Sequence, residues 1–230
     1  MGAACCSGHA NFDGMSKAYK RVLWGVLAIN AVMFVVEMVA GVAAGSQALQ
    51  ADALDFLGDS VTYGISLAVI GMSLRVRATA ALLKGISLSL MGAWILGSTI
   101  YRVFVTGIPS AEIMGLIGFL ALAANLVSVL LLMKWKDGDA NVRSVWLCSR
   151  NDAIGNVAVL LAASGVWASG TAWPDLIVAS LMAGLFLWSS VQIIRQARQE
   201  LSSARQAAAA KELPRAHEDL PPIEGQKLPL

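Results

Sequence analysis

Five acidic residues stand inside segments of the sequence that are otherwise apolar: Glu37, Asp52, Asp55, Asp59 and Asp152. A carboxylate in a membrane helix costs several kcal/mol unless it is protonated, paired or bound to a metal, so each of the five is a candidate functional group. The chemistry open to such groups is the binding of a cation or the transfer of a proton.

The spacing of these acids places them on two helix faces. Asp52, Asp55 and Asp59 are three and four residues apart, so one face of a helix carries all three. Cys148 and Asp152 are four residues apart and share a face of another helix. Two oxygens from the first helix, with a sulfur and an oxygen from the second, would complete the tetrahedral four-ligand shell that zinc prefers. A thiolate also favours softer ions such as cadmium over magnesium or calcium.

A structural alternative stays open for the same side chains, which could remain protonated and only hydrogen-bond between helices. Asp52 either has this structural role or lines an exit path for the ion, because the residue lies toward the outer end of its span. Glu37 is interpreted as a structural or proton-handling group. Asn125 and Asn156 are expected to hydrogen-bond between helices.

The composition indicates the elements that must position these groups. Of the 230 residues, 57% are hydrophobic and 14% are charged, and the mean hydropathy is +0.66, so lipid is the expected solvent. Six apolar segments are each long enough to cross a hydrocarbon core of about 30 Å. They lie at about 22–44, 48–71, 83–105, 112–133, 144–168 and 175–194. The predicted fold is an all-α integral membrane protein, a bundle of six transmembrane helices.

Basic residues sort to one end of the predicted bundle, which sets its orientation. They gather at 17–21, 75–84, 134–143 and 195–205. Arg102 is the single basic residue near the other end, so the positive-inside rule predicts that both termini are cytoplasmic. We therefore expect a cytoplasmic N-terminal segment at 1–20, a membrane domain at 21–195, and a short, largely disordered tail at 196–230 with no folded domain.

Two further features bear on partners. The net charge of +2 and the scattered basic residues do not favour nucleic acid as a partner. Cys5, Cys6 and His9 near the N-terminus could capture a metal ion in the cytoplasm, although a flexible tail with incidental cysteines is the alternative. His217 in the C-terminal tail is a weaker candidate of the same kind. Neither a prosthetic group nor enzyme activity is predicted.

The membrane part as a whole resembles the cation diffusion facilitators. The resemblance rests on Asp55-x-x-x-Asp59, on Cys148-x-x-x-Asp152 and on Asp-Ala-Ile-Gly-Asn at 152–156. It implies that Asp55, Asp59, Cys148 and Asp152 bind a metal ion, and that cytoplasmic Zn²⁺ or Cd²⁺ is exchanged for protons. The family usually has His or Asp where Cys148 stands, so Ser149 or Asn151 could contribute there instead.

The resemblance also sets expectations about assembly. Members of the family usually continue into a dimerising cytoplasmic domain, which the residues after Arg195 are too few to form, so any homodimer is expected to use transmembrane helices. The expected partners are the divalent ion, protons and the lipid bilayer, which in a bacterium would be the inner membrane.

An antiport cycle follows from the chemistry of such a site. Acidic ligands this close would repel one another if all were ionised, so the empty site is expected to hold protons that a metal ion displaces. Two other classes of function stay open: a membrane receptor or scaffold that binds metal without moving it, and a transporter of organic cations. The latter should line its site with aromatic residues, and Phe56 alone lies close to these acids in sequence.

Overall fold

A computed structural model describes the backbone of residues 16–68, 74–105, 107–135 and 140–218. It describes the side chains of these ranges except those of 66, 74, 77, 135, 140–148 and 207–218.

The described residues form six α-helices and one short 3-10 helix, with no strand among them. They are α1 (Lys17–Ala44), α2 (Gln47–Ala68), α3 (Leu74–Phe104), α4 (Ala111–Leu132), the 3-10 helix (Met133–Trp135), α5 (Ala140–Ser169) and α6 (Trp173–Glu218). The predicted all-α fold is confirmed. Five of the described helices have the length and hydropathy of a membrane span. The sixth, α2, carries the three aspartates and falls outside that group.

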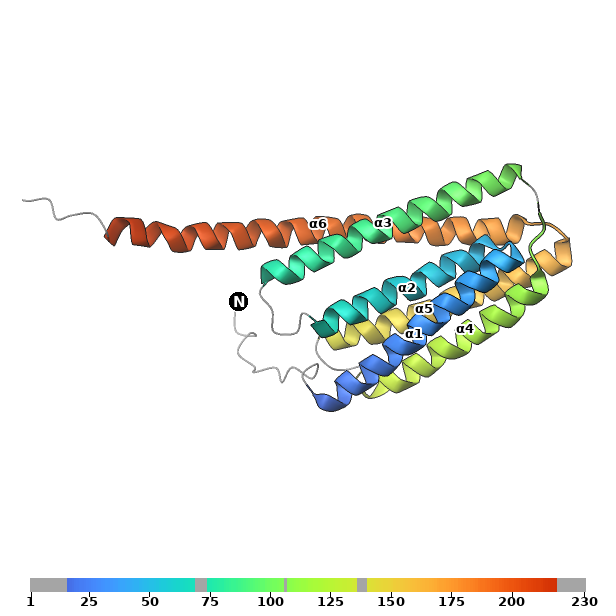
Figure 1. The fold of residues 1–230 in the computed structure, drawn as a ribbon, viewed down its shortest axis with the longest axis horizontal. Helices are drawn as coiled ribbons and strands as arrows, with labels where there is room; N and C mark the ends of the chain where they lie inside the picture. The colour runs from blue at the N-terminus through green and yellow to red at the C-terminus, as the bar shows by residue number, and fades with distance from the viewer. Residues whose placement is uncertain (1–15, 69–73, 106, 136–139, 219–230) are drawn as a thin grey trace, which may run out of the picture.

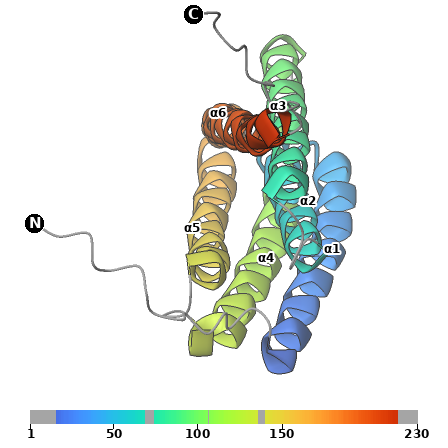
Figure 2. The same ribbon diagram turned by 90° about the vertical axis from the view of Figure 1, so that its left-hand side faces the viewer.

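Four helices form one bundle and the other two form a pair beside it. α1 packs most extensively on α2, and α4 on α5, whereas α3 makes its largest contact with α6. Figure 1 shows α1, α2, α4 and α5 running side by side, with α3 and α6 along one flank and α6 extending beyond the rest. The view along the bundle in Figure 2 shows α6 next to the upper part of α3 and outside the other four helices.

The turn from α1 to α2 follows from a glycine. Gly45 has φ +69°, in the left-handed region where a residue with a Cβ is disfavoured. Its N–H donates to the carbonyl oxygen of Val42 at 3.2 Å, and the N–H of Ser46 donates to that of Gly41 at 2.9 Å. This pattern ends α1 and satisfies its last carbonyls, so that α2 can begin two residues later.

The start of α2 is capped by an acid from α6. Asp175 is buried and accepts hydrogen bonds from the backbone N–H groups of Gln47 at 2.8 Å and Ala48 at 3.0 Å. It also accepts from the Ser46 hydroxyl at 2.6 Å. The first N–H groups of a helix have no partner within the helix and carry partial positive charge, so a carboxylate stabilises them. Asp175 therefore fixes the N-terminus of α2 to α6.

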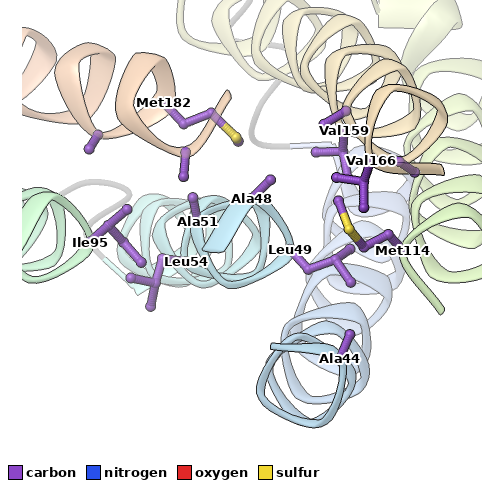
Figure 3. Packing of buried hydrophobic residues seen from close by; sticks show 14 of the residues in the cluster. Ala44, Ala48, Leu49, Ala51, Leu54, Ile95, Met114, Val159, Val166 and Met182 are labelled. Atoms are coloured by element: carbon purple, nitrogen blue, oxygen red, sulfur yellow. The ribbon is translucent and has the colours of Figure 1, made fainter. Parts of the chain in front are cut away.

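Small side chains allow the helices of the core to approach closely. The main buried cluster contains Ala48 and Ala51 of α2 together with Met182 and other residues of α6. Figure 3 shows these two alanines on the side of α2 that faces α6, while Leu49 lies next to Met114 of α4. Small residues at helix contacts are typical of membrane bundles, where packing rather than water drives association.

The outer surface of the described helices is apolar. Large hydrophobic side chains such as Leu116, Trp167 and Trp188 are each more than 65% exposed. Water-soluble proteins seldom expose so much apolar surface, and a lipid environment accounts for it.

The ends of the helices differ from the predicted spans chiefly at α6. That helix continues to Glu218, well beyond the predicted end of the sixth span near residue 194. Residues 196–218 are therefore helical, where a largely disordered tail was expected, and 219–230 lie outside the described residues. The side of the membrane on which the termini lie and the division into three segments stay predictions.

The contact between α3 and α6 supplies a test of the fold. A Cβ on Gly85 would come within 2.7 Å of Ile194 Cγ1, whereas nothing lies within 4 Å of a Cβ on Gly97 in the same helix. We expect Gly85→Ala to destabilise the protein by about 1–3 kcal/mol through overpacking. Gly97→Ala should be neutral or slightly stabilising. Thermal unfolding of the purified variants in detergent measures both, and equal behaviour would contradict the described packing.

Candidate metal site

The acids of α2 meet an acid of α5. Asp152 lies against α2, where its carboxyl group interacts with those of both Asp55 and Asp59. Asp55 and Asp59 are one helical turn apart and also interact with each other. All three side chains are half-buried. The structure thus brings together three of the four predicted metal ligands; their role as ligands stays a prediction.

The fourth predicted ligand is not placed. Cys148 belongs to α5, one turn before Asp152, but its side chain lies outside the described residues. Among the described side chains, no three His, Cys, Asp or Glu residues form a group ready to hold a metal ion. The three carboxyl groups are therefore neighbours without being arranged as a completed ligand shell.

A tyrosine that the sequence analysis missed lies at the same cluster. The hydroxyl of Tyr63 donates a hydrogen bond to Asp59 Oδ2 and lies 3.4 Å from Ser149 Oγ of α5. Tyr63 is fully buried and follows Asp59 by four residues, so the helical spacing that joined the three aspartates also includes it. Its hydroxyl orients one carboxyl group of the cluster.

The two alternatives to Cys148 differ in position. Ser149 is buried and faces Tyr63. Asn151 is exposed, and its side-chain oxygen accepts a hydrogen bond from Arg150 at 3.3 Å. Of the two, only Ser149 lies at the cluster.

Lys84 of α3 is a second residue that the sequence analysis did not assign to the site. Its charge acts on both Asp55 and Asp59. A basic group near two carboxylates partly offsets their mutual repulsion. Lys84 comes from the α3–α6 pair, whereas the acids belong to the four-helix bundle.

A chain of amides leads from α4 through α5 to Asp52. Asn125 Nδ2 donates to Asn156 Oδ1 at 2.8 Å, and Asn156 Nδ2 donates to Asp52 Oδ2 at 2.7 Å. All three side chains are buried. The interhelical hydrogen bonds expected of the two asparagines are therefore present, and they fix the carboxyl group of Asp52.

Glu37 lies on the other side of Asp52. This residue of α1 is fully buried, and Asp52 is the neighbouring acid that acts on it most strongly. Apart from this carboxyl group of Asp52, neither carboxyl oxygen of Glu37 has a hydrogen-bond partner. Cys5, Cys6 and His9 lie outside the described residues, as does the side chain of His217.

Comparison with known proteins identifies the fold. The family model of the cation efflux transmembrane domain matches residues 23–202 of the sequence, which include the greater part of each of the six helices. The chain belongs to the cation efflux family. It is accordingly a multi-pass membrane protein.

Three bacterial relatives illustrate the cation efflux similarity. The chain is 28% identical to the metal cation efflux system protein CzcD of Cupriavidus metallidurans, over 74% of this chain and 56% of that protein. It is 26% identical to the cadmium, cobalt and zinc/H(+)-K(+) antiporter of Bacillus subtilis, over 82% of this chain and 64% of that one. It is 29% identical to the zinc transporter ZitB of Yersinia pestis, over 79% and 62%. The chain thus spans less than two thirds of the length of these relatives.

The Tyr63 contact generates a prediction about metal affinity. Tyr63→Phe removes the hydroxyl that orients Asp59 and keeps the ring that fills the core. We expect the Kd for zinc to rise about tenfold, as when a group that orients a metal ligand is lost. Tyr101→Phe is the control, because Tyr101 lies on α3 and is 65% exposed. Calorimetric titration with zinc measures both variants, and an equal Kd would contradict the orienting role.

Proposed function

We propose that this chain exports a divalent transition-metal cation, zinc or cadmium, in exchange for protons. The observation that carries the proposal is the contact of Asp152 with both Asp55 and Asp59 inside a bundle that lies in lipid. The proposal makes the protein a transporter rather than an enzyme.

The coupling to protons follows from the closeness of the three acids. Carboxyl groups in contact in a low-dielectric interior need a proton or a cation between them, because two bare negative charges repel. Metal ligands must be deprotonated, so an incoming ion displaces the protons. Ion and protons thus occupy one site in turn, and the release of one accompanies the binding of the other.

The helix arrangement supports an alternating cycle. The acids belong to the unit of α1, α2, α4 and α5, whereas α3 and α6 form a separate pair. Asp175 of α6 ties the pair to the start of α2. Rocking of one unit against the other, as in other secondary transporters, would therefore open most widely at the end away from this tie.

The relatives support metal ions as the substrate class. Their names assign metal cation efflux, zinc transport, and the antiport of cadmium, cobalt and zinc to those proteins. In this chain the carboxylate oxygens and the thiol of Cys148 suit zinc and cadmium better than magnesium or calcium. If the cell is bacterial, the membrane is the inner one, and export is from the cytoplasm.

Replacing an acid of the cluster tests the site. Asp59→Ala and Asp152→Ala should each abolish zinc uptake into proteoliposomes that carry a pH gradient, since each removes an oxygen ligand. Glu112→Gln is the control, because Glu112 is exposed in the first turn of α4. Unchanged uptake in either aspartate variant would refute the assignment. A protein that binds zinc but takes none up would be a receptor and not a transporter.

Cys148 supplies a test of metal preference. A serine at this position keeps the size of the side chain and replaces a soft ligand with a hard one. We expect Cys148→Ser to reduce cadmium uptake more than zinc uptake in the same proteoliposomes. Equal losses for the two ions would argue against a sulfur ligand.

A further inference from the structure

We propose that Glu37 and Asp52 form a second cation subsite, distinct from the cluster of Asp55, Asp59 and Asp152, which holds a divalent metal ion through oxygen ligands alone. The proposal rests on the proposed function, because the subsite is a stage in the export of the same ion. It assigns a role to the two acids that the cluster does not use.

The strongest observation is the state of Glu37. Its side chain is 0% exposed, yet apart from the neighbouring carboxyl group of Asp52 neither carboxyl oxygen has a hydrogen-bond partner. Burying a polar group without a partner costs free energy, and a carboxyl group costs more than a neutral one. Its nearest acidic neighbour, Asp52, is another buried carboxyl group rather than a donor. A cation between the two would satisfy both.

Asp175 shows what a purely structural acid looks like in the same protein. It is as deeply buried as Glu37, but it accepts two backbone hydrogen bonds and one from a serine hydroxyl. Glu37 has none of these. The bundle therefore supplies donors where an acid only holds helices together, and it leaves Glu37 with oxygens available to a ligand.

The amide chain prepares Asp52 for such a ligand. Asn156 donates to Asp52 Oδ2 at 2.7 Å, and Asn125 holds Asn156 through its oxygen at 2.8 Å. A ligating carboxylate is usually held by a second group in this way, which fixes its direction and favours its charged form. Glu37, Asp52, Asn156 and Asn125 come from α1, α2, α5 and α4, so the subsite lies where all four helices of the bundle meet.

The position of the subsite fits a stage in the passage of the ion. Asp52 precedes Asp55 by three residues, which is a rise of about 4.5 Å along α2. The shift is toward the end of α2 that Asp175 caps. An ion that leaves the cluster in this direction meets Asp52 and Glu37 next. Two sites in series, each of moderate strength, let an ion enter readily and still leave.

The subsite should differ from the cluster in the metal ions that it prefers. Glu37 and Asp52 offer carboxylate oxygens without a thiol, and oxygen ligands discriminate less strongly for soft ions. Its ligand is therefore a divalent cation bound by hard donors, with zinc as a suitable probe.

The test compares bound zinc in two variants of the full-length chain by equilibrium dialysis. In the first, Asp59→Asn and Asp152→Asn together disable the cluster. In the second, Glu37→Gln is added. We expect the second variant to hold one zinc ion fewer per chain, whereas adding Glu112→Gln instead should change nothing. Equal binding with and without Glu37→Gln would overturn the subsite. Because both variants keep the N-terminal Cys5, Cys6 and His9, zinc held there cancels in the comparison.

A transport assay distinguishes failure of the subsite from failure of the proposed function. In an otherwise unchanged chain, Glu37→Gln should lower zinc uptake into proteoliposomes at least about tenfold. Asp52→Asn is the second variant, with gel filtration and thermal unfolding as checks that each variant folds. If the unchanged chain takes up zinc and both folded variants retain that uptake in full, the subsite is overturned and the proposed function stands. Absence of uptake by the unchanged chain overturns the proposed function instead.

Discussion

A carboxyl group inside a membrane bundle has to find a proton, a hydrogen-bond donor or a cation, because the surrounding lipid and apolar side chains offer nothing else. Six of the buried or half-buried acids among the described residues meet that requirement in different ways. Asp175 is satisfied by the N-terminus of α2, and Asp52 by an amide chain. Asp55, Asp59 and Asp152 face one another, and Glu37 has only the carboxyl group of Asp52 as a partner. The acids that lie beside another acid mark the path on which we place the ion.

The same requirement explains how the helices are organised around that path. Buried alanines bring α2 close to α6, and the Asp175 cap joins these helices at one end. The four helices that carry the acids and amides are held to each other by hydrogen bonds such as that from Asn125 to Asn156. The charge of Lys84, which belongs to the other unit, acts on Asp55 and Asp59. A displacement of the pair formed by α3 and α6 would therefore change the charge that the cluster experiences.

Much of this arrangement could be predicted from local patterns. The apolar segments predicted six helices, and the spacing of Asp52, Asp55 and Asp59 predicted one acidic face, because both depend on helical periodicity alone. The cap by Asp175 could not be predicted, since its partner Ser46 is 129 residues away and no periodicity links them. Lys84 was missed for the same reason. Tyr63 was not assigned to the site although its spacing from Asp59 offered a signal, because spacing alone does not show that a hydroxyl meets a carboxyl group.

The ion itself can be located directly. Anomalous diffraction at the zinc edge, from crystals of the chain loaded with zinc, would place the metal among the helices. We expect an ion between α2 and α5 with oxygens of Asp55, Asp59 and Asp152 at about 2.0–2.2 Å from it. Zinc bound elsewhere in the membrane bundle, with these three carboxyl groups contacting only protein, would contradict the account.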